Sequence, residues 1–392
     1  MRIKSIQLIL LICLLFSVAC SYHPKHTDFS KQTSSFKIYN QAIPITVSLD
    51  NDEYFNQLGH YLKLTSYVKL APEPLLATLR QIQIQDDRIY VVDRLNRMVC
   101  YDMIGKVIFQ IHAIGNGPGE YNEINSFTIN SDRNELVIYD NIRSSLLYYS
   151  ADNGKFLKSE KLEKPNPSEM AFFDGRYFYN NRDHKNYPND SLYHYSLLSS
   201  KDGHNIEQTC FPHNDDEEAY RFSPSLQTFY RNDNKLYYCK NFDHIVYRLN
   251  RDSVISCYNI ALPNPLPTRE IEKQADEYSL LNSDYSFGIS NVFENDHLLY
   301  FRFFNKRFIH NVLYDLRTNE QICCVKSLQE KPNPKVPLLD IINGVYKDQF
   351  FGILSPDFIQ YWKEKYPSNL PDIFRNYDAS SDNPVIVFCS PF

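Results

Sequence analysis

The sequence predicts an all-β fold, a six-bladed β-propeller of four-stranded antiparallel blades with short helical insertions. The chain of 392 residues is rich in side chains that suit pleated surfaces, with 30 Tyr and 26 Phe against only 11 Gly. Asp or Asn, followed after one or two residues by an apolar-aromatic run, recurs along the chain. Six such marks can be counted, at Asp87, Asn134, Asp174, Asn234, Asp296 and Asp348.

The clearest repeat lies in residues 86–162. The run 87–93 (DRIYVVD) is echoed by 134–140 (NELVIYD), and each is followed by a polar turn and a second apolar run, at 98–101 and 146–149. Each second run leads to a Gly-Lys turn and then to a third run. Apolar runs separated by tight turns predict two consecutive antiparallel sheets.

The spacing of the marks indicates propeller blades. The intervals are 47, 40, 60, 62 and 52 residues. A period of roughly 40–50 residues with three or four strands is typical of blades, and the longer intervals predict loop insertions. Because a lone four-stranded sheet leaves both faces uncovered, radial packing is favoured, which buries both faces and leaves only short edges. Residues 174–330 follow the pattern more loosely.

Two segments with helical spacing interrupt the strands. Residues 269–281 place apolar side chains on one face. Ser355 offers an N-cap with Pro356 in the first turn, and apolar residues including Trp362 follow at helical spacing. We expect both segments to be insertions on a blade.

The last predicted strand, residues 384–389, has no partner downstream. We expect it to pair with an N-terminal strand, either 43–49 or 67–70, and so to close the ring. Such closure removes the free sheet edges that the two ends of the chain would otherwise leave.

Residues 1–19 predict a lipoprotein signal peptide. Arg2 and Lys4 form a charged start, and residues 8–16 form an apolar stretch too short to span a bilayer well. The small residues before Cys20 resemble the lipobox of bacterial lipoproteins, which implies cleavage before Cys20 and acylation of its thiol and new amino group. The alternative is an ordinary secretory signal in which Cys20 stands by chance.

Residues 20–40 are polar and predict a flexible tether between the lipid and a propeller domain spanning 41–392. Several acyl chains make a stable membrane anchor. The residues after Cys20 are not acidic, unlike those of some surface-exported lipoproteins. This favours an outer-membrane protein facing the periplasm, with surface exposure as the alternative. No later stretch is long and apolar enough for a membrane span.

Residues 114–121 (IGNGPGEY) follow the third run of the first repeat. This string, together with 382–387 (DNPVIV), resembles the six-bladed β-propeller lipoproteins related to the NHL and TolB-like propellers. The resemblance covers most of the chain and is strongest in residues 86–162 and at the end. It implies the propeller fold and an envelope location, and it implies no catalytic residues.

The glycine-rich string invites comparison with a phosphate cradle. That interpretation is disfavoured because no helix follows, Pro118 removes one N–H donor and no Lys-Ser/Thr pair closes the loop. We expect a tight structural joint between blades, in which Glu120 accepts backbone N–H bonds, with ligand contact as the alternative. The motif comprises Gly115, Gly117, Pro118, Gly119, Glu120 and Tyr121.

Asp93 and Asp140 occupy equivalent positions just after strands. Paired carboxylates serve acid–base chemistry or metal binding, but their repetition at one place in each blade favours turn capping. The acidic run 213–218 lacks the ligand spacing of a calcium loop, and we expect a solvated loop there. The chain lacks zinc spacing and the HExxH and GxSxG patterns, so we expect no metal and no cofactor.

Nine cysteines occur in the sequence. Setting aside Cys13 in the leader and Cys20 leaves seven, an odd number that cannot all pair within the chain. Most stand inside apolar strand runs, where a thiol behaves as a small hydrophobe. We expect buried free thiols, with a disulfide as the alternative. Adjacent Cys323 and Cys324 are poorly placed to bridge.

The net charge is −6 and no Lys/Arg stripe is present, so nucleic-acid binding is not expected. The sequence favours a monomeric, non-enzymatic binding or scaffold module that presents loops to an envelope protein, peptide or glycan. The alternative is a propeller enzyme, a lyase or hydrolase with carboxylate or histidine chemistry at the mouth of the central channel. A convergent cluster of titratable groups would favour the enzyme.

Overall fold

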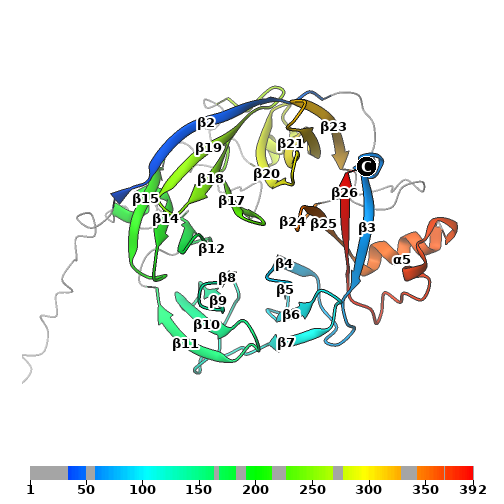
Figure 1. Ribbon diagram of the computed structural model, residues 1–392, viewed down its shortest axis with the longest axis horizontal. Coiled ribbons are helices and arrows are strands. Elements are labelled where there is room, and N and C mark those ends of the chain that lie inside the picture. The colour runs from blue at the N-terminus through cyan, green and yellow to red at the C-terminus, as the bar shows by residue number, and fades with distance from the viewer. Residues whose placement is uncertain are drawn as a thin grey trace, which may run out of the picture. The chain divides into compact units, whose positions relative to one another are not determined.

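Short antiparallel sheets stand around a common centre in the unit Thr33–Phe392 (Figure 1). The structure is a computed structural model that describes residues 34–49, 58–162, 167–181, 191–213, 227–267, 277–327, 342–365 and 367–391. The strand before each Asp/Asn mark lies nearest the centre, and the strands that follow the mark lie farther out. This arrangement is an all-β propeller with few helices, as the sequence predicts.

The two clearest repeats form two four-stranded sheets whose strands follow one another in sequence order. Buried side chains of both sheets, including Val92 and Ile138, form one hydrophobic cluster between them. The first sheet comprises β4 (Leu79–Gln85), β5 (Arg88–Asp93), β6 (Met98–Asp102) and β7 (Val107–Ile111). The second comprises β8 (Ser126–Asn130), β9 (Glu135–Asp140), β10 (Ser145–Ser150) and β11 (Phe156–Lys161).

Two further sheets repeat this order. One comprises β12 (Glu169–Phe173), β13 (Arg176–Asn180), β14 (Tyr195–Ser200) and β15 (Ile206–Pro212), with β1 (Ser34–Ser35) added in parallel to β15. The other comprises β20 (Ser286–Glu294), β21 (Leu298–Asn305), β22 (Phe308–Asp315) and β23 (Glu320–Ser327).

The remaining strands form a nine-stranded sheet, joined at its middle through one residue pair, Asn232 with Val345. On one side of that pair lie β16 (Phe229–Asn232), β17 (Lys235–Cys239), β18 (Ile245–Asn250), β19 (Ser253–Ala261) and the parallel strand β2 (Lys37–Thr46). On the other side lie β24 (Gly344–Tyr346), β25 (Gln349–Leu354), β26 (Val385–Pro391) and β3 (Leu62–Lys69).

Each of the six Asp/Asn marks lies in the hairpin between the first and second strand of its repeat. Four of the marks have positive φ, Asp87 at 55°, Asn134 at 54°, Asp174 at 50° and Asp348 at 63°. Asn and Asp tolerate this left-handed conformation better than most residues, and two-residue hairpins require it. The Asp/Asn marks therefore recur because each repeat has a tight turn at this position, where such residues are favoured.

The ring closes between the two ends of the described chain. Strand β26 pairs antiparallel with β3, and Val387 lies opposite Tyr67. Closure on residues 67–70 is thus confirmed, and β3 begins earlier than predicted, at Leu62. The other candidate, 43–49, instead falls largely in β2, which pairs in parallel with β19.

Residues 34–40, expected to be part of a flexible tether, are paired in the sheets instead. Phe36 stands between β1 and β2 and is buried, with its ring centre 6.2 Å from that of Phe178. The domain boundary predicted at residue 41 is therefore too late. Strand hydrogen bonds and the burial of Phe36 extend the folded unit back to residue 34 or earlier.

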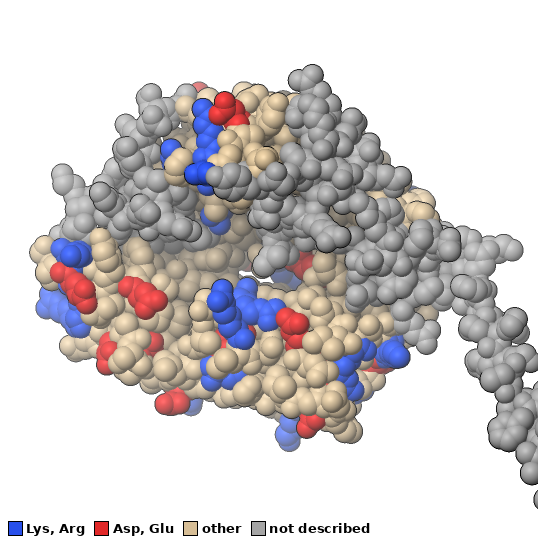
Figure 2. All heavy atoms as spheres, turned by 180° about the vertical axis from the view of Figure 1, so that it is seen from behind, with Lys and Arg blue, Asp and Glu red and all other residues tan. Residues whose placement is uncertain are grey.

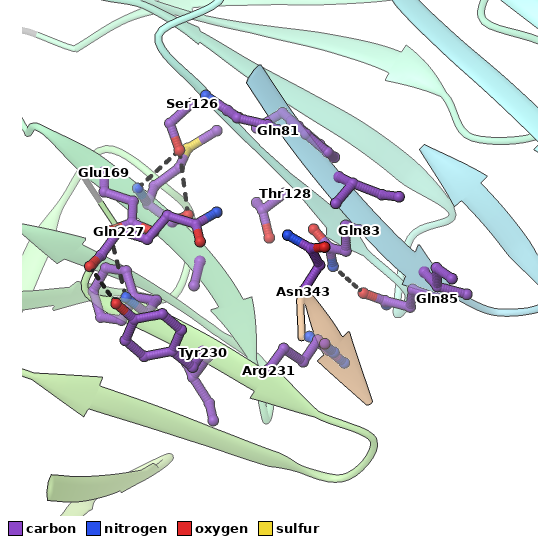
Figure 3. A pocket seen from close by; sticks show the side chains of 18 of the residues that line it. Gln81, Gln83, Gln85, Ser126, Thr128, Glu169, Gln227, Tyr230, Arg231 and Asn343 are labelled. Atoms are coloured by element: carbon purple, nitrogen blue, oxygen red, sulfur yellow. Dashed lines mark hydrogen bonds between the residues drawn. The ribbon is translucent and has the colours of Figure 1, made fainter. Parts of the chain in front are cut away.

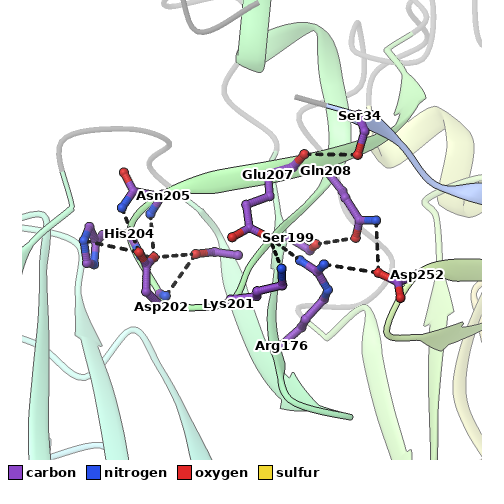
Figure 4. Close-up of polar contacts among 12 residues, drawn as sticks. Ser34, Arg176, Ser199, Lys201, Asp202, His204, Asn205, Glu207, Gln208 and Asp252 are labelled. Atoms are coloured by element: carbon purple, nitrogen blue, oxygen red, sulfur yellow. Dashed lines mark hydrogen bonds and ion pairs between the residues drawn. The ribbon is translucent and has the colours of Figure 1, made fainter. Parts of the chain in front are cut away.

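Arg176 of β13 connects its sheet to the turn between β18 and β19, next to these N-terminal strands (Figure 4). Its side chain is 5% exposed and its guanidinium contacts Glu207 at 2.8 Å and Asp252 at 3.1 Å. The hydroxyl of Ser34 donates to the carbonyl of Glu207 at 3.5 Å, and the N–H of Lys37 donates to the carbonyl of Asp252 at 3.3 Å. One buried cation thus positions both residues to which the N-terminal strands attach.

The helix predicted after Ser355 is confirmed as α5 (Pro356–Lys365), and the Ser355 hydroxyl accepts the N–H of Phe358 at 3.3 Å. Of the helix predicted in 269–281, residues 268–276 lie outside the described residues, and α4 (Glu277–Asn282) covers the end. Short turns are α2 (Leu58–Tyr61), η3 (Ser191–His194), η5 (Pro367–Asn369) and η6 (Asp372–Phe374). Within the described ranges, no helix has the length and apolar character needed to cross a membrane.

All seven cysteines beyond the leader region are free thiols, as predicted. Five of them are buried and two are partly exposed, Cys257 and Cys324. Burial raises the pKa of Cys100 to about 12. Such thiols stay protonated at neutral pH and pack as small apolar groups.

We predict that Ile386→Ala destabilises the unit by about 2–5 kcal/mol, because it opens a cavity where the ring closes. Ile386 is fully buried in a cluster that joins β3 and β26 to the first sheet. Urea unfolding followed by circular dichroism measures the change. The control is Ile373→Ala, since Ile373 is 39% exposed. Equal unfolding midpoints for both variants would contradict the importance of closure.

Candidate functional site

The first strands of the sheets enclose a central cavity of about 950 Å³, which we call the channel. Strands β4, β8, β12, β16 and β24 supply most of its wall, and β20 contributes Phe293. Figure 2 shows a hollow near the middle of the face turned away in Figure 1, with basic side chains beside it. Amide and hydroxyl side chains of the wall include those of Gln81, Gln83, Gln85, Ser126, Thr128, Gln227 and Asn343 (Figure 3).

The wall is polar partly because innermost strands have an unpaired backbone edge. Ser126 and Thr128 of β8 cover the edge of β12, their hydroxyls accepting the N–H groups of Met170 at 3.1 Å and Phe172 at 2.8 Å. The Gln81 amide of β4 donates to the carbonyl of Asn125, next to β8, at 2.7 Å. Side chains of one sheet therefore satisfy backbone groups of the next.

Glu169 is one of the carboxylates of the wall, and its hydrogen bonds hold the start of β16. It accepts the N–H of Thr228 at 2.6 Å and the hydroxyl of Thr228 at 2.7 Å. Farther along β16, the Asn232 amide oxygen accepts the N–H of Glu294 at 3.0 Å. Glu169 is thus already engaged in joining two sheets, which disfavours a role as a catalytic acid or base.

Two amide side chains retain hydrogen-bonding groups that face the channel. Gln83 donates to Gln85 at 2.6 Å, and its own oxygen has no partner within the described residues. Asn343 accepts the N–H of Ile353 at 3.1 Å, and its NH₂ group has no partner within the same ranges. One acceptor from β4 and one donor from the residue before β24 are therefore available.

Arg231 of β16 lies where the channel meets a second cavity of about 520 Å³. Its guanidinium donates to the carbonyl of Phe172 at 2.8 Å and lies 5.5 Å from the ring centre of Phe173. Burial lowers the pKa of Arg231, although the charges of Asp86 and Asp233 act to raise it. The group stays protonated, because an arginine pKa begins above 12.

A family model described as "Domain of unknown function (DUF4934)" matches residues 31–390. The chain belongs to the DUF4934 family. The match covers all described residues except Pro391, and it includes the N-terminal strands that lie before the predicted domain boundary. No curated protein matches this DUF4934 chain.

Two solved structures resemble the DUF4934 chain. The crystal structure of a "putative exported protein" from Bacteroides fragilis has a TM-score of 0.73 at 19% identity, covering 90% of this chain and 99% of that one. A DUF4221 family member from Bacteroides vulgatus has a TM-score of 0.50 at 10% identity, covering 85% and 99%. At such low identity these likenesses show the propeller fold alone.

The glycine-rich motif of the DUF4934 chain connects β7 to β8 outside the channel wall. Glu120 accepts the N–H of Gly117 at 2.7 Å, and a bridge pairs Ile114 with Tyr121. Gly119 has a φ of 78°, and an added Cβ there would lie 2.8 Å from the ring of Phe156. Gly115 and Pro118 belong to the same turn. This loop packs between two sheets, and the structure does not bring it together with the channel residues.

Asp93 and Asp140 hold equivalent turns in the first two sheets. Asp93 is fully buried, accepts the N–H of Leu95 at 2.9 Å and pairs with the Arg97 guanidinium at 2.6 Å. Asp140 accepts the N–H groups of Ile142 at 3.1 Å and Asn122 at 2.8 Å. Burial acts to raise the pKa of Asp93, but hydrogen bonds from Arg97 and from backbone N–H groups hold it below its ordinary value.

The channel residues were not singled out from the sequence. Their signal is present in 79–85 (LRQIQIQ), where glutamine alternates with isoleucine in a strand next to the first repeat. An amide at every second position places polar groups along one face of an interior strand. This indicates a wall that is enclosed by the fold and still in contact with water. Of the acidic run 213–218, residues 214–218 lie outside the described residues. The described residues contain no His/Cys/Asp/Glu group arranged for a metal.

We predict that Asp93→Asn lowers stability at pH 7 by about 1.5–3 kcal/mol, since it removes charged hydrogen bonds to Arg97. Because the pKa of Asp93 is lowered in the folded state, this stabilisation is present above the ordinary Asp pKa and is lost as the pH falls through the lowered value. Urea unfolding at pH 7 and pH 3 measures the difference, with exposed Asp132→Asn as control. A deficit that stays constant down to pH 3 would contradict the assignment.

Proposed function

We propose that this DUF4934 protein is a lipid-anchored, six-bladed propeller of the cell envelope that binds a polar ligand, a peptide or glycan, in its channel. One observation carries the proposal. The channel is large enough for a small ligand, and Gln83 and Asn343 in its wall have hydrogen-bonding groups without partners in the described residues. Unused polar groups at the centre of a rigid ring are suited to recognition.

Two features support six blades. The hairpins that bear the six Asp/Asn marks each join an inner strand to a second strand. The nine-stranded sheet joins two such sets through the single pair Asn232 with Val345. One residue pair at the inner ends of β16 and β24 is a contact between neighbouring inner strands, and we count the strands on its two sides as separate blades.

Binding is favoured over the enzyme alternative by what the channel wall contains. Its described residues include no histidine. The carboxylate of Glu169 is engaged by Thr228, and Asp233 accepts the N–H of Lys347 at 3.0 Å. A lyase or hydrolase needs an acid or base free to reach its substrate. Amides and hydroxyls instead provide neutral donors and acceptors in fixed positions.

The envelope location rests on the leader and on the relatives. Residues 1–19 have the pattern of a lipoprotein signal, and Cys20 follows its small residues. The similar Bacteroides fragilis protein is described as exported. The folded unit begins by residue 34, which leaves residues 20–33 as the connection to the lipid. We propose attachment to the outer membrane with the propeller in the periplasm.

We predict that Cys20→Ser abolishes acylation and moves the protein from the membrane to the soluble fraction. The measurement is incorporation of an alkyne-labelled fatty acid in bacteria expressing the full chain, followed by fractionation. Cys13→Ser is the matched control, because Cys13 lies within the leader and its loss leaves the acylated residue in place. Label retained in the Cys20 variant would exclude the anchor.

We predict that Gln83→Trp abolishes ligand binding, because it removes the amide oxygen that has no partner in the described residues and places a bulky ring where the ligand would contact the wall. Saturation-transfer NMR of the full chain with short peptides, among them tri-alanine, and with oligosaccharides, among them chitotriose, measures binding. Gln110→Trp on the outer strand β7 is the control, since Gln110 is exposed and far along its sheet from β4. Absence of signal from both ligand classes, or equal signal from both variants, would refute channel binding.

A further inference from the structure

We infer that Arg231 makes the channel a carboxylate site. The ligand is a small acid whose carboxylate pairs with the Arg231 guanidinium and whose adjacent amide or hydroxyl meets Gln83 and Asn343. This inference rests on the proposed function and specifies its ligand class.

Most of the hydrogen-bonding capacity of Arg231 is unused. A guanidinium has five N–H donors, and within the described residues one donation is made, to the carbonyl of Phe172. Within the same residues Arg231 takes part in no ion pair. The ring of Phe173 lies 5.5 Å from the guanidinium and burial lowers the pKa of Arg231, and a partly desolvated cation that makes no ion pair is energetically costly. A bound anion would relieve that cost.

The two carboxylates whose charges act on Arg231, those of Asp233 and Asp86, form hydrogen bonds with other groups. Asp233 accepts the N–H groups of Lys347 at 3.0 Å and Asp348 at 3.1 Å, across the junction of β16 and β24. Asp86 accepts the hydroxyl of Ser131 at 2.9 Å. These bonds fix the hairpins at the end of the channel. Neither carboxylate forms an ion pair with Arg231 within the described residues, so the remaining N–H donors of its guanidinium are available to a ligand in the cavity.

Three segments aim complementary groups into the same space (Figure 3). Arg231 comes from β16, Gln83 from β4 and Asn343 from the residue just before β24. Gln83 offers an acceptor and Asn343 a donor, so the pair matches a ligand group that both donates and accepts. An amide next to a carboxylate and a hydroxyl next to a carboxylate both have this chemistry.

The charges favour a carboxylate over a phosphate. Asp86 and Asp233 already add negative potential around Arg231. Because like charges repel, each further negative charge on a ligand weakens binding, so a phosphate dianion is disfavoured more than a carboxylate monoanion. A planar carboxylate also fits the guanidinium through two parallel hydrogen bonds. The C-terminus of a short peptide and an acidic sugar are the two sources of such a group.

The test is calorimetry on the full chain with two matched pairs of probes. One pair is tri-alanine with a free carboxylate and tri-alanine amide. The other is glucuronate and neutral glucose, which differ only in the carboxylate. We expect at least one acid to bind about 10- to 100-fold more tightly than its neutral counterpart, and Arg231→Gln to remove this preference. Arg231→Lys should retain part of it, because the charge remains and the planar fork is lost.

Arg317→Gln is the control for the loss of one positive charge, since Arg317 is 65% exposed and pairs with Asp315 on an outer turn. It should leave both preferences unchanged. Neutral probes binding as well as acids to the unaltered protein would overturn the carboxylate site while leaving channel binding intact. That comparison needs no variant, so misfolding of Arg231→Gln does not affect it. The arm that binds identifies a peptide or a sugar as the source.

Discussion

The unpaired inner edge of each central strand is the constraint on which this propeller depends. An inner strand pairs with its own sheet on one side only, and its remaining N–H and C=O groups face the channel or the next sheet. Ser126, Thr128 and Gln81 meet such groups with side chains, and Glu169 and Asn232 do so farther around the ring. Neighbouring sheets are thereby held in register by polar bonds as well as by apolar packing.

The same constraint shapes the candidate site. Side chains that satisfy a strand edge must be polar and must lie at the centre, so the channel wall is rich in amides and hydroxyls for structural reasons. A residue in that wall points to ligand binding when it has more hydrogen-bonding groups than the strand edges use. Arg231, Gln83 and Asn343 meet this condition, and Ser126 and Thr128 do not.

The parts of the fold that depend on local geometry could be predicted from the sequence. Hairpin positions follow from Asp and Asn residues that accept positive φ, and the N-cap of α5 follows from Ser355. Ring closure by 384–389 was predictable because a last strand without a partner needs one. The pairing of β2 with β19 was not, since it joins residues over 200 positions apart with no turn to mark it. Nor does any pattern reveal that Arg231 makes no ion pair within the described residues, because that depends on how segments far apart in the sequence converge.

Strand β2 gives the N-terminal end of the propeller a particular mechanical character. It runs parallel to β19 over most of its length, and Phe36 and the bonds around Arg176 hold the chain just before it. Tension drawn along β2 from the N-terminal side would load these hydrogen bonds together in shear, whereas peeling would break them one at a time. Tension applied at the N-terminal side would therefore be borne first by the hydrogen bonds between β2 and β19, at the outer edge of their sheet. The inner strands that line the channel would feel little of it.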